Sequence, residues 1–249
     1  MKTILITGGS KGIGFSMARK CLQEGCRVIL LARDLKGLEK AKQELISLGF
    51  DSERIFINVA DMEKVRELKK MIEQLPWVQE GLDGLVNNAA IEILGKTESF
   101  EIDDMERMIR VNAIAPVVMI QSCWKALVQK KGSVVNVGSI ADQRFHEIYG
   151  IYGASKGFLR TFTKHVAQEL GFQGVKINLV SPGGTQTPLL DEIAAKHFKA
   201  SDIESTLKTI PMEQRWGTSD EIAEAIWFAL SGPRYFHGDD IRIHGGVAS

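Results

Sequence analysis

Short, continuously apolar runs alternate with longer amphipathic segments along most of this 249-residue chain. Strands that are apolar on both faces are typical of parallel sheets covered by helices on each side. A strand with one solvent-exposed face instead alternates apolar and polar residues. The runs that read as strands are residues 4–7, 28–32, 55–59, 82–87, 133–137, 176–180 and 241–244. The pattern therefore predicts an α/β fold built on a mostly parallel, seven-stranded sheet.

The segments between these runs have helical periodicity. They cover about residues 12–24, 35–48, 62–75, 102–129, 152–170 and 218–230. Strand–helix–strand crossovers are right-handed, which distributes the helices over both faces of one sheet. We therefore expect a three-layer, doubly wound (Rossmann-like) fold, with the whole chain, residues 1–249, in a single domain.

Charge and composition argue against several kinds of partner. The 31 basic and 31 acidic residues cancel, so we expect no nucleic acid and no anionic membrane as partner. No apolar run approaches the roughly 18 residues of a membrane span, and glycines interrupt the apolar start of the chain at once. The cysteines, Cys21, Cys26 and Cys123, have no metal-binding spacing, and the histidines form no HxH or HExxH pair. These features predict a cytoplasmic protein without a metal site.

Residues 7–14 read Thr-Gly-Gly-Ser-Lys-Gly-Ile-Gly, directly after a predicted strand and at the start of a predicted helix. Glycines at positions 8, 12 and 14 permit a tight turn, a close approach of the backbone to a pyrophosphate, and tight packing of helix on strand. The helix N-terminus then offers free amides and a positive dipole end to that anion. An ordinary glycine-rich turn is the alternative, but this context favours a dinucleotide site.

Two tyrosines and a lysine lie close together in Tyr149-Gly-Ile-Tyr152-Gly-Ala-Ser-Lys156. Residues four apart share one face of a helix, so Tyr152, and not Tyr149, can hold the Lys156 ammonium group beside its ring. A nearby cation lowers the pKa of a phenol from its free value of about 10, which suits an acid/base group. The alternative is a half-buried helix tyrosine beside a solvated lysine.

Further motifs accompany these two in a fixed order. They are Asn87-Asn88-Ala89-Ala90 after the fourth strand, Asn112 in the long helix, Ser139 after the fifth strand, and Pro182-Gly183 after the sixth. Together with Thr-Gly-x-x-x-Gly-x-Gly and Tyr-x-x-x-Lys, they make the chain similar to the short-chain dehydrogenase/reductase family over its whole length. The resemblance implies the doubly wound fold and a nicotinamide cofactor.

The resemblance also implies a catalytic set of four residues: Asn112, Ser139, Tyr152 and Lys156. Tyr152 would exchange a proton with the substrate oxygen, and Ser139 would hydrogen-bond that oxygen. Lys156 would lower the pKa of Tyr152 and hold the nicotinamide ribose, while Asn112 would hold a water that links Lys156 to solvent. Each residue also has an ordinary structural role open to it, as a turn, helix or buried amide group.

A set of cofactor-contacting residues follows from the same resemblance. Asp61 would meet the adenine amino group, although it can equally cap the helix expected from residue 62. Asn88 would brace the cofactor and the central strands, and Ala90 replaces the family's usual glycine. The full set is Thr7, Gly8, Ser10, Lys11, Gly12, Ile13, Gly14, Arg33, Asp61, Met62, Asn88, Ala89, Tyr152, Lys156, Pro182, Gly183, Thr185 and Thr187.

The end of the second strand distinguishes NADP(H) from NAD(H). An acidic side chain there would bond a ribose 2′-hydroxyl and repel a 2′-phosphate. This chain has Ala32 at that position, followed by Arg33, with Lys11 in the glycine loop. Two cations without a carboxylate favour NADP(H) over NAD(H). Asp34 leaves the question open, because it can either cap the next helix or bond the ribose.

These expectations combine into an oxidoreductase that transfers a hydride between NADP(H) and a carbonyl or secondary alcohol, as in ketone or 3-oxoacyl reduction. The alternatives are an NAD(H)-dependent alcohol dehydrogenase, a non-catalytic NADP(H)-binding sensor, and an isomerase or dehydratase that cycles its cofactor. The resemblance further implies a homo-oligomer, a tetramer built through the helices at 102–129 and 152–170.

The substrate is expected between residues 140–149 and the long segment 184–217, which we predict to be a lid. Aromatic and aliphatic side chains in both segments suggest a mid-sized, partly apolar small molecule. The candidate lining residues are His146, Tyr149, Leu189, Phe198, Met212 and Trp216.

Overall fold

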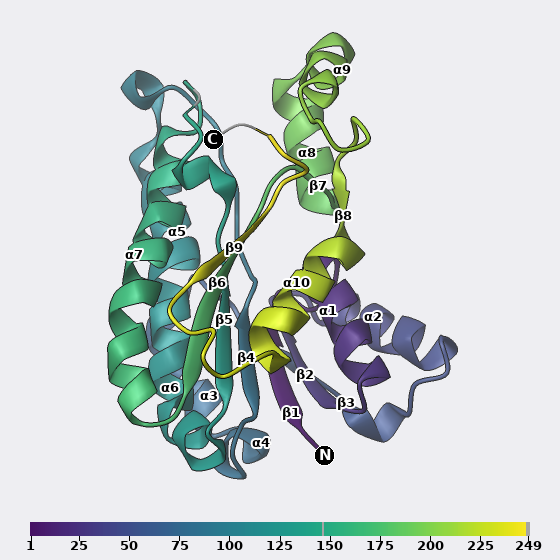
Figure 1. Ribbon diagram of the computed structural model, residues 1–249, viewed down its shortest axis with the longest axis vertical. Helices are drawn as coiled ribbons and strands as arrows, with labels where there is room; N and C mark the ends of the chain where they lie inside the picture. The colour runs from purple at the N-terminus through teal and green to yellow at the C-terminus, as the bar shows by residue number, and fades with distance from the viewer. Residues whose placement is uncertain (146, 248–249) are drawn as a thin grey trace.

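The computed structural model describes residues 1–145 and 147–247 (Figure 1). Seven strands form one sheet in the order β3-β2-β1-β4-β5-β6-β9, and neighbouring strands run parallel. The strands are β1 (Thr3–Thr7), β2 (Arg27–Ala32), β3 (Ile55–Val59), β4 (Gly84–Asn87), β5 (Ser133–Val137), β6 (Lys176–Pro182) and β9 (Asp240–Ile243). The order reverses direction between β1 and β4, so the expected doubly wound α/β sheet is confirmed.

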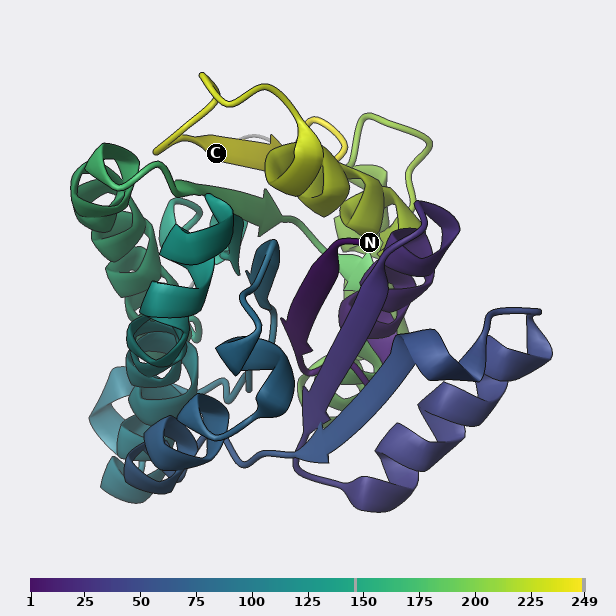
Figure 2. The same ribbon diagram turned by 90° about the horizontal axis from the view of Figure 1, so that it is seen from below.

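Helices cover both faces of this sheet, which gives three layers (Figure 2). One face carries α1 (Gly12–Gln23), α2 (Leu35–Ser47) and α10 (Ser219–Ser231). The other carries α3 (Val65–Glu73), α6 (Ala115–Lys130) and α7 (Gly150–Phe172).

Strand β1 explains the continuous apolar runs of the sequence. Leu5 lies in the hydrophobic cluster shared with α3, α6 and α7, whereas Ile4 and Ile6 lie in the cluster shared with α1, α2 and α10. All three side chains are at most 1% exposed. Since successive side chains of a strand point to opposite faces, a strand buried on both faces carries apolar residues at successive positions.

Two predicted helices have different boundaries from those expected. The helix expected at 62–75 begins at Val65, because Asp61 Oδ1 accepts a hydrogen bond from Glu63 N at 3.0 Å and holds a turn there; α4 (Pro76–Gln79) follows it. The helix expected at 102–129 consists of α5 (Ile102–Ile109), a π-helical turn (Arg110–Ile114) and α6. A π turn marks a local change of hydrogen-bond register inside a helix.

The stretch Ile102–Lys130 is long and apolar enough to cross a membrane by length and composition alone, but 61% of its most apolar part is buried inside the protein. Its residues Met119, Ile120 and Leu127 pack on the sheet in the cluster that contains Leu5. This burial explains the apolar composition as that of a core helix.

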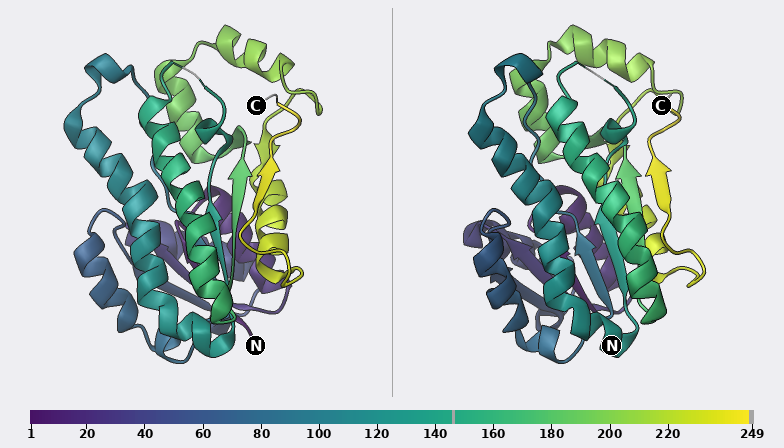
Figure 3. Two further views of the ribbon diagram at one scale, coloured as in Figure 1. Left: turned by 60° about the vertical axis from the view of Figure 1, so that its left-hand side comes forward. Right: turned by 90° about the vertical axis from the view of Figure 1, so that its left-hand side faces the viewer.

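The segment 184–217 is more regular than the sequence suggested. It contains α8 (Pro188–His197) and α9 (Ala200–Lys208), which stand over the carboxyl ends of the strands (Figure 3). Strand β7 (Thr185–Gln186) pairs in parallel with β8 (Gly217–Thr218), so the two ends of the segment are tied together at its base.

Candidate active site

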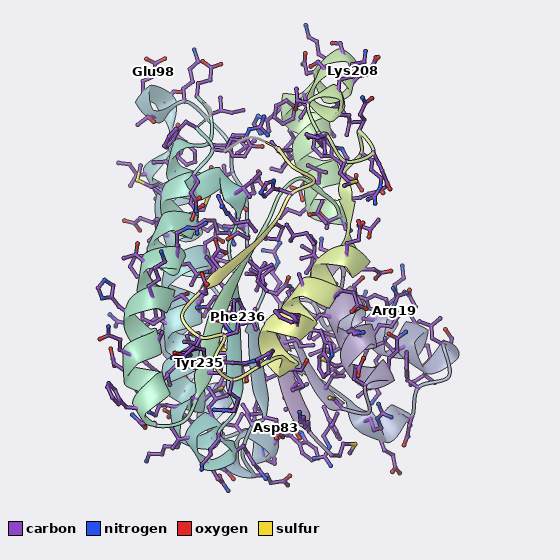
Figure 4. All side chains as sticks on the ribbon, viewed as in Figure 1. Arg19, Asp83, Glu98, Lys208, Tyr235 and Phe236 are labelled. Atoms are coloured by element: carbon purple, nitrogen blue, oxygen red, sulfur yellow. The ribbon has the colours of Figure 1, made fainter. Side chains whose placement is uncertain are left out.

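A cavity of about 790 Å³ lies at the carboxyl ends of the strands. The glycine loop, the segments after β4 and β5, the first turn of α7 and the helices α8 and α9 line it. Two arms flank its opening: Glu98 stands at the tip of one, and Lys208 at the end of α9 on the other (Figure 4). Within residues 1–145 and 147–247, no group of three His, Cys, Asp or Glu side chains is placed to hold a metal ion. The volume is in the range of small-molecule sites.

The glycine loop has the geometry that the sequence predicts for a close turn. Gly8 and Gly12 have φ angles of +67° and +56°, which favour glycine. A Cβ atom on Gly14 would lie 2.2 Å from the carbonyl oxygen of Gly8, so only glycine allows α1 to pack this closely on the loop. Gly8 and Gly12 line the cavity, while Gly14 supports them from behind.

The N-terminus of α1 faces this cavity. Its N-cap residue, Lys11, makes no side-chain capping bond, and Gly12 and Ile13 in the first turn line the cavity. Amide groups at a helix N-terminus attract anions through hydrogen bonds and the helix dipole. Together with the close packing at Gly14, this arrangement fits the pyrophosphate of a dinucleotide.

We predict that Gly14→Ala disrupts this loop. The added methyl group would overlap the Gly8 carbonyl, so we expect unfolding free energy to fall by about 1–3 kcal/mol and NADPH affinity to fall about tenfold or more. Thermal melting and a fluorescence titration measure the two effects. Gly217→Ala is the matched control, because a Cβ there would meet its nearest neighbour at an ordinary 3.7 Å. Equal affinities for both variants would contradict the prediction.

Asn88 and Thr7 join the glycine loop to the central strands. Asn88 Nδ2 donates to the carbonyl oxygens of Thr7 and Gly8 at 2.9 and 3.3 Å. Thr7 Oγ1 accepts from the amides of Asn88 and Ala89 at 3.0 Å each. Thr7 itself is buried, so its contribution is to hold the loop, whereas Asn88 and Ala89 also line the cavity.

The far end of the cavity is rich in cations. Lys11 and Arg33 are exposed at its rim, as the sequence predicted for this end of β2. Lys196 of α8, which sequence reasoning missed, joins them and donates to Glu192 at 2.8 Å. That hydrogen bond is the first cause, and the charges of Lys11 and Arg33 further causes, that lower the pKa of Glu192. Three cations and one carboxylate therefore surround this rim.

Asp34 acts as a helix cap in this structure. Its carboxylate accepts hydrogen bonds from Lys36 N at 3.2 Å and Gly37 N at 3.0 Å, which caps α2. Of the two roles that the sequence left open for Asp34, the structure contains the helix cap. Asp61 and Met62 line the cavity beside the end of β3.

The segment after β6 forms the opposite wall. Pro182, Gly183, Thr185 and Thr187 all line the cavity. Gly183 N donates to Ile243 O at 2.8 Å, and Thr185 Oγ1 donates to Gly183 O at 2.9 Å. Thr187 Oγ1 caps α8 by accepting from a backbone amide at 3.1 Å. Both threonine hydroxyl groups therefore take part in hydrogen bonds within the protein.

Tyr152, Lys156 and Ser139 lie together in the wall of the cavity. Tyr152 and Lys156 lie one turn apart on α7 and are 7% and 3% exposed. The Lys156 Nζ atom is 5.9 Å from the centre of the Tyr152 ring and donates to Val137 O at 2.9 Å. Ser139, at the end of β5, hydrogen-bonds to Tyr152 and accepts from Ala141 N at 3.1 Å. The predicted pairing of this tyrosine with this lysine on one helix face is present.

The pKa of Tyr152 is raised, whereas the sequence argument predicted that the nearby cation lowers it. Burial, followed by the negative charge of Glu92, raises the pKa of Tyr152 well above 10, and the hydrogen bond with Ser139 opposes this rise. Burial also lowers the pKa of Lys156 to about 8, against the charges of Glu92 and Asp142. The sequence argument considered the cation alone and omitted burial, which disfavours both charged forms.

Asn112 supports the site from behind. It is 1% exposed, and its side chain exchanges two hydrogen bonds with the backbone of Ile91, at 2.9 and 2.8 Å. Its Nδ2 atom also donates to Ser155 Oγ at 3.1 Å, within α7. The π turn that holds Asn112 is thereby connected to the segment after β4 and to α7.

A buried ion network, which sequence reasoning missed, anchors the segment after β5. Arg160 of α7 pairs with both Asp142 and Asp240, and the Asp142 Oδ1 contact is 2.9 Å. Ser181 of β6 donates to Asp240 Oδ1 at 2.7 Å. No local sequence signal connects these residues, because they are brought together only by the sheet order.

The predicted substrate wall is partly as expected. Tyr149, Leu189, Phe198 and Trp216 line the cavity. Met212 was predicted to line the substrate site, and this prediction is wrong. Its side chain is 63% exposed and lies outside the cavity lining, and its backbone amide donates to Gly245 O. His146 falls outside the described residues. Glu92, which was not predicted, lies in this wall.

Comparisons with known proteins agree with this geometry. The profile of the family described as short chain dehydrogenase matches residues 2–197. A 3-oxoacyl-[acyl-carrier-protein] reductase of Homo sapiens is 29% identical over 247 residues, covering 99% of this chain and 98% of that protein. A 3-oxoacyl-[acyl-carrier-protein] reductase of Buchnera aphidicola is 30% identical over 99% of this chain and 97% of its own. The solved structure of a short chain dehydrogenase from Burkholderia cenocepacia in complex with NADP has a TM-score of 0.86 and 27% identity, and covers 100% of this chain and 98% of that one.

Proposed function

We propose, since this chain belongs to the short-chain dehydrogenase family, that it is an oxidoreductase that reduces a ketone to a secondary alcohol with NADPH. The observation that carries the proposal is the buried cluster of Tyr152, Lys156 and Ser139 in the same cavity as the glycine loop. The relatives named as 3-oxoacyl-[acyl-carrier-protein] reductases support reduction of a carbonyl group. In this proposal the domain spans residues 1–249, and residues 184–217 are its substrate lid.

The proposed reaction assigns one task to each residue of the cluster. The nicotinamide supplies the hydride when the cofactor is bound. Ser139 donates a hydrogen bond to the carbonyl oxygen and holds it beside Tyr152. Tyr152 then gives its proton to the oxygen as negative charge develops there, and the positive Lys156 stabilises the phenolate that remains. The raised pKa of Tyr152 keeps it protonated at neutral pH, which suits reduction.

The choice of NADP(H) rests on the cationic rim. Lys11, Arg33 and Lys196 offer positive charge to a 2′-phosphate, and Asp34 is engaged as a helix cap. The NADP complex of the Burkholderia cenocepacia relative supports the same choice. The alternatives are an NAD(H)-dependent alcohol dehydrogenase and a non-catalytic NADP(H)-binding sensor, and the complete catalytic cluster disfavours the second.

A fluorescence titration of the protein with NADPH and, separately, NADH tests the cofactor proposal. We expect NADPH to bind at least about tenfold more tightly, because a phosphate–arginine contact is a strong, charge-assisted one. Tighter binding of NADH would favour the alcohol dehydrogenase alternative. Binding of neither cofactor by folded protein would refute the oxidoreductase proposal.

Arg33→Ala should weaken NADPH binding by about 10- to 100-fold, because it removes a charge-assisted contact to the 2′-phosphate. NADH affinity should change by less than about threefold, since NADH lacks that phosphate. The same titration measures both. Arg234→Ala is the matched control, because Arg234 lies at the amino ends of the strands and bonds to Lys131 O. Equal losses for NADPH and NADH would contradict the assignment of Arg33.

The protein is further proposed to be a cytoplasmic homotetramer with no nucleic acid or membrane partner. Exposed apolar side chains along the long helices support a contact between copies: Ile114 is 41%, Phe158 48% and Phe172 93% exposed. Phe158 and Phe162 stack on α7 with ring centres 6.2 Å apart. Light scattering at micromolar concentration should give four times the chain mass, and a monomer would contradict this proposal.

A further inference from the structure

Glu92 places a carboxyl group in the part of the cavity wall that also contains Tyr149 and Tyr152. It belongs to the segment that follows β4, between Ile91 and Ile93. Both neighbours pack against the hydrophobic cluster that contains Leu94 and Tyr152. The substrate end of the cavity therefore combines apolar walls with one acidic group close to the proposed acid/base.

The part of the chain that the structure describes satisfies only part of the hydrogen-bonding capacity of this carboxyl group. The Tyr149 hydroxyl hydrogen-bonds to it, and Lys156 is near enough for its charge to act on it. Among residues 1–145 and 147–247, Glu92 forms no ion pair within 4.0 Å. A carboxylate can accept about four hydrogen bonds, so the described residues leave acceptor positions open on Glu92, which lines the cavity.

Burying a carboxylate costs free energy unless hydrogen bonds replace the water that it loses. Burial raises the pKa of Glu92 to about 7, although Lys156 and Tyr149 oppose the rise. A plain apolar ketone in the cavity would exclude water and leave the carboxyl with still fewer partners. A substrate with a hydrogen-bond donor would supply the missing partner.

The surrounding charges indicate which donor fits. Lys156 lies close to Glu92, and the charge of Arg144 acts on the neighbouring Tyr149. Both cations would repel an ammonium group on the substrate, and Glu92 would repel an anionic one. A neutral hydroxyl group meets neither repulsion and can donate to the carboxyl.

We propose that Glu92 is a specificity-determining residue that accepts a hydrogen bond from a substrate hydroxyl group, so that the preferred substrates are hydroxy ketones. This inference rests on the proposed ketone reduction and adds the substrate class to it. It also distinguishes this chain from reductases whose substrates carry only an alkyl chain beside the carbonyl. Sites built to bond a substrate hydroxyl discriminate strongly against analogues that lack it.

A matched series of ketones tests the proposal: 2-butanone, 1-hydroxy-2-butanone and 4-hydroxy-2-butanone, each with NADPH. We expect wild-type kcat/KM to be at least about tenfold higher for one of the hydroxy ketones than for 2-butanone. Glu92→Leu should abolish this preference, and Glu92→Gln, which keeps an acceptor oxygen, should retain part of it. Glu98→Gln is the control, since Glu98 is exposed on the same segment and lies outside the cavity lining (Figure 4).

Wild-type protein that reduces all three ketones without preference, or a preference that survives in Glu92→Leu, would overturn the inference while the proposed reduction stands. Absence of NADPH oxidation with every ketone would instead count against the proposed function. Calorimetric binding of 1,2-butanediol and 2-butanol then tests Glu92 without turnover. Wild-type protein should bind the diol more tightly and Glu92→Leu should bind both alcohols equally; equal binding by the wild type would overturn the inference.

Discussion

Tyr152→Phe should lower kcat for ketone reduction by about 10²- to 10⁴-fold, the usual contribution of a positioned acid/base. The variant removes one hydroxyl group from a side chain that is only 7% exposed, so the surrounding packing is preserved. NADPH affinity should stay within about twofold, because the glycine loop and the cationic rim are unchanged. Steady-state kinetics and the NADPH titration measure the two quantities.

Tyr235→Phe is the matched control for this experiment. Tyr235 is fully exposed and lies far from the cavity, toward the other end of the molecule (Figure 4). Its variant should keep wild-type kcat and NADPH affinity. If Tyr152→Phe retained more than about a tenth of wild-type activity, the proton would come from another group and the role assigned to Tyr152 would be wrong.

Lys156→Met should lower kcat by about 100-fold and NADPH affinity by about tenfold. The unbranched methionine side chain preserves most of the packing, but the charge beside Tyr152 and the proposed hydrogen bonds to the ribose are lost. The ammonium group of Lys156 is bonded to Val137 O. Arg160 lies one turn further along α7 but is paired with Asp142 and Asp240, so it is not available to replace Lys156.

The same variant should change the pH dependence of the reaction. The pKa of Lys156 is lowered to about 8, so the wild type loses this positive charge as the pH rises through that value. Reduction should therefore slow above pH 8 in the wild type, and this alkaline decline should be absent from Lys156→Met. Lys164→Met, at an exposed position of the same helix, should keep the decline. An unchanged profile in Lys156→Met would make the lysine a bystander.

Much of the fold and of the candidate site could be predicted because the sequence patterns that indicate them are local. Continuous apolar runs such as residues 28–32 indicate a strand that is buried on both faces, and β2 (Arg27–Ala32) lies there. The spacing of four residues between Tyr152 and Lys156 directly predicts that they share one helix face. The signal of the glycine loop is equally local. A Cβ atom on Gly14 would clash with the backbone of Gly8 in the same loop, so this contact alone requires glycine at position 14.

The parts that were not predicted depend on distant partners or on burial. Glu92 looks like an ordinary polar residue in the sequence, and only the fold places it beside Tyr149 and Lys156. The pKa of Tyr152 moved against expectation for the same reason, because its burial is a property of the assembled cavity. Helices α8 and α9 of segment 184–217 were missed because few of their residues are buried, which leaves a weak periodic signal.

The most direct test of the central claim follows a hydride from cofactor to product. NADPH that carries deuterium at both hydrogen positions of nicotinamide C4 is incubated with the protein and 1-hydroxy-2-butanone or 2-butanone, and the alcohol is analysed by mass spectrometry. We predict one alcohol formed for each NADPH oxidised, with deuterium on the former carbonyl carbon, and no such product with Tyr152→Phe. NADPH oxidation without deuterium in the alcohol, or without any alcohol, would contradict the proposed hydride transfer.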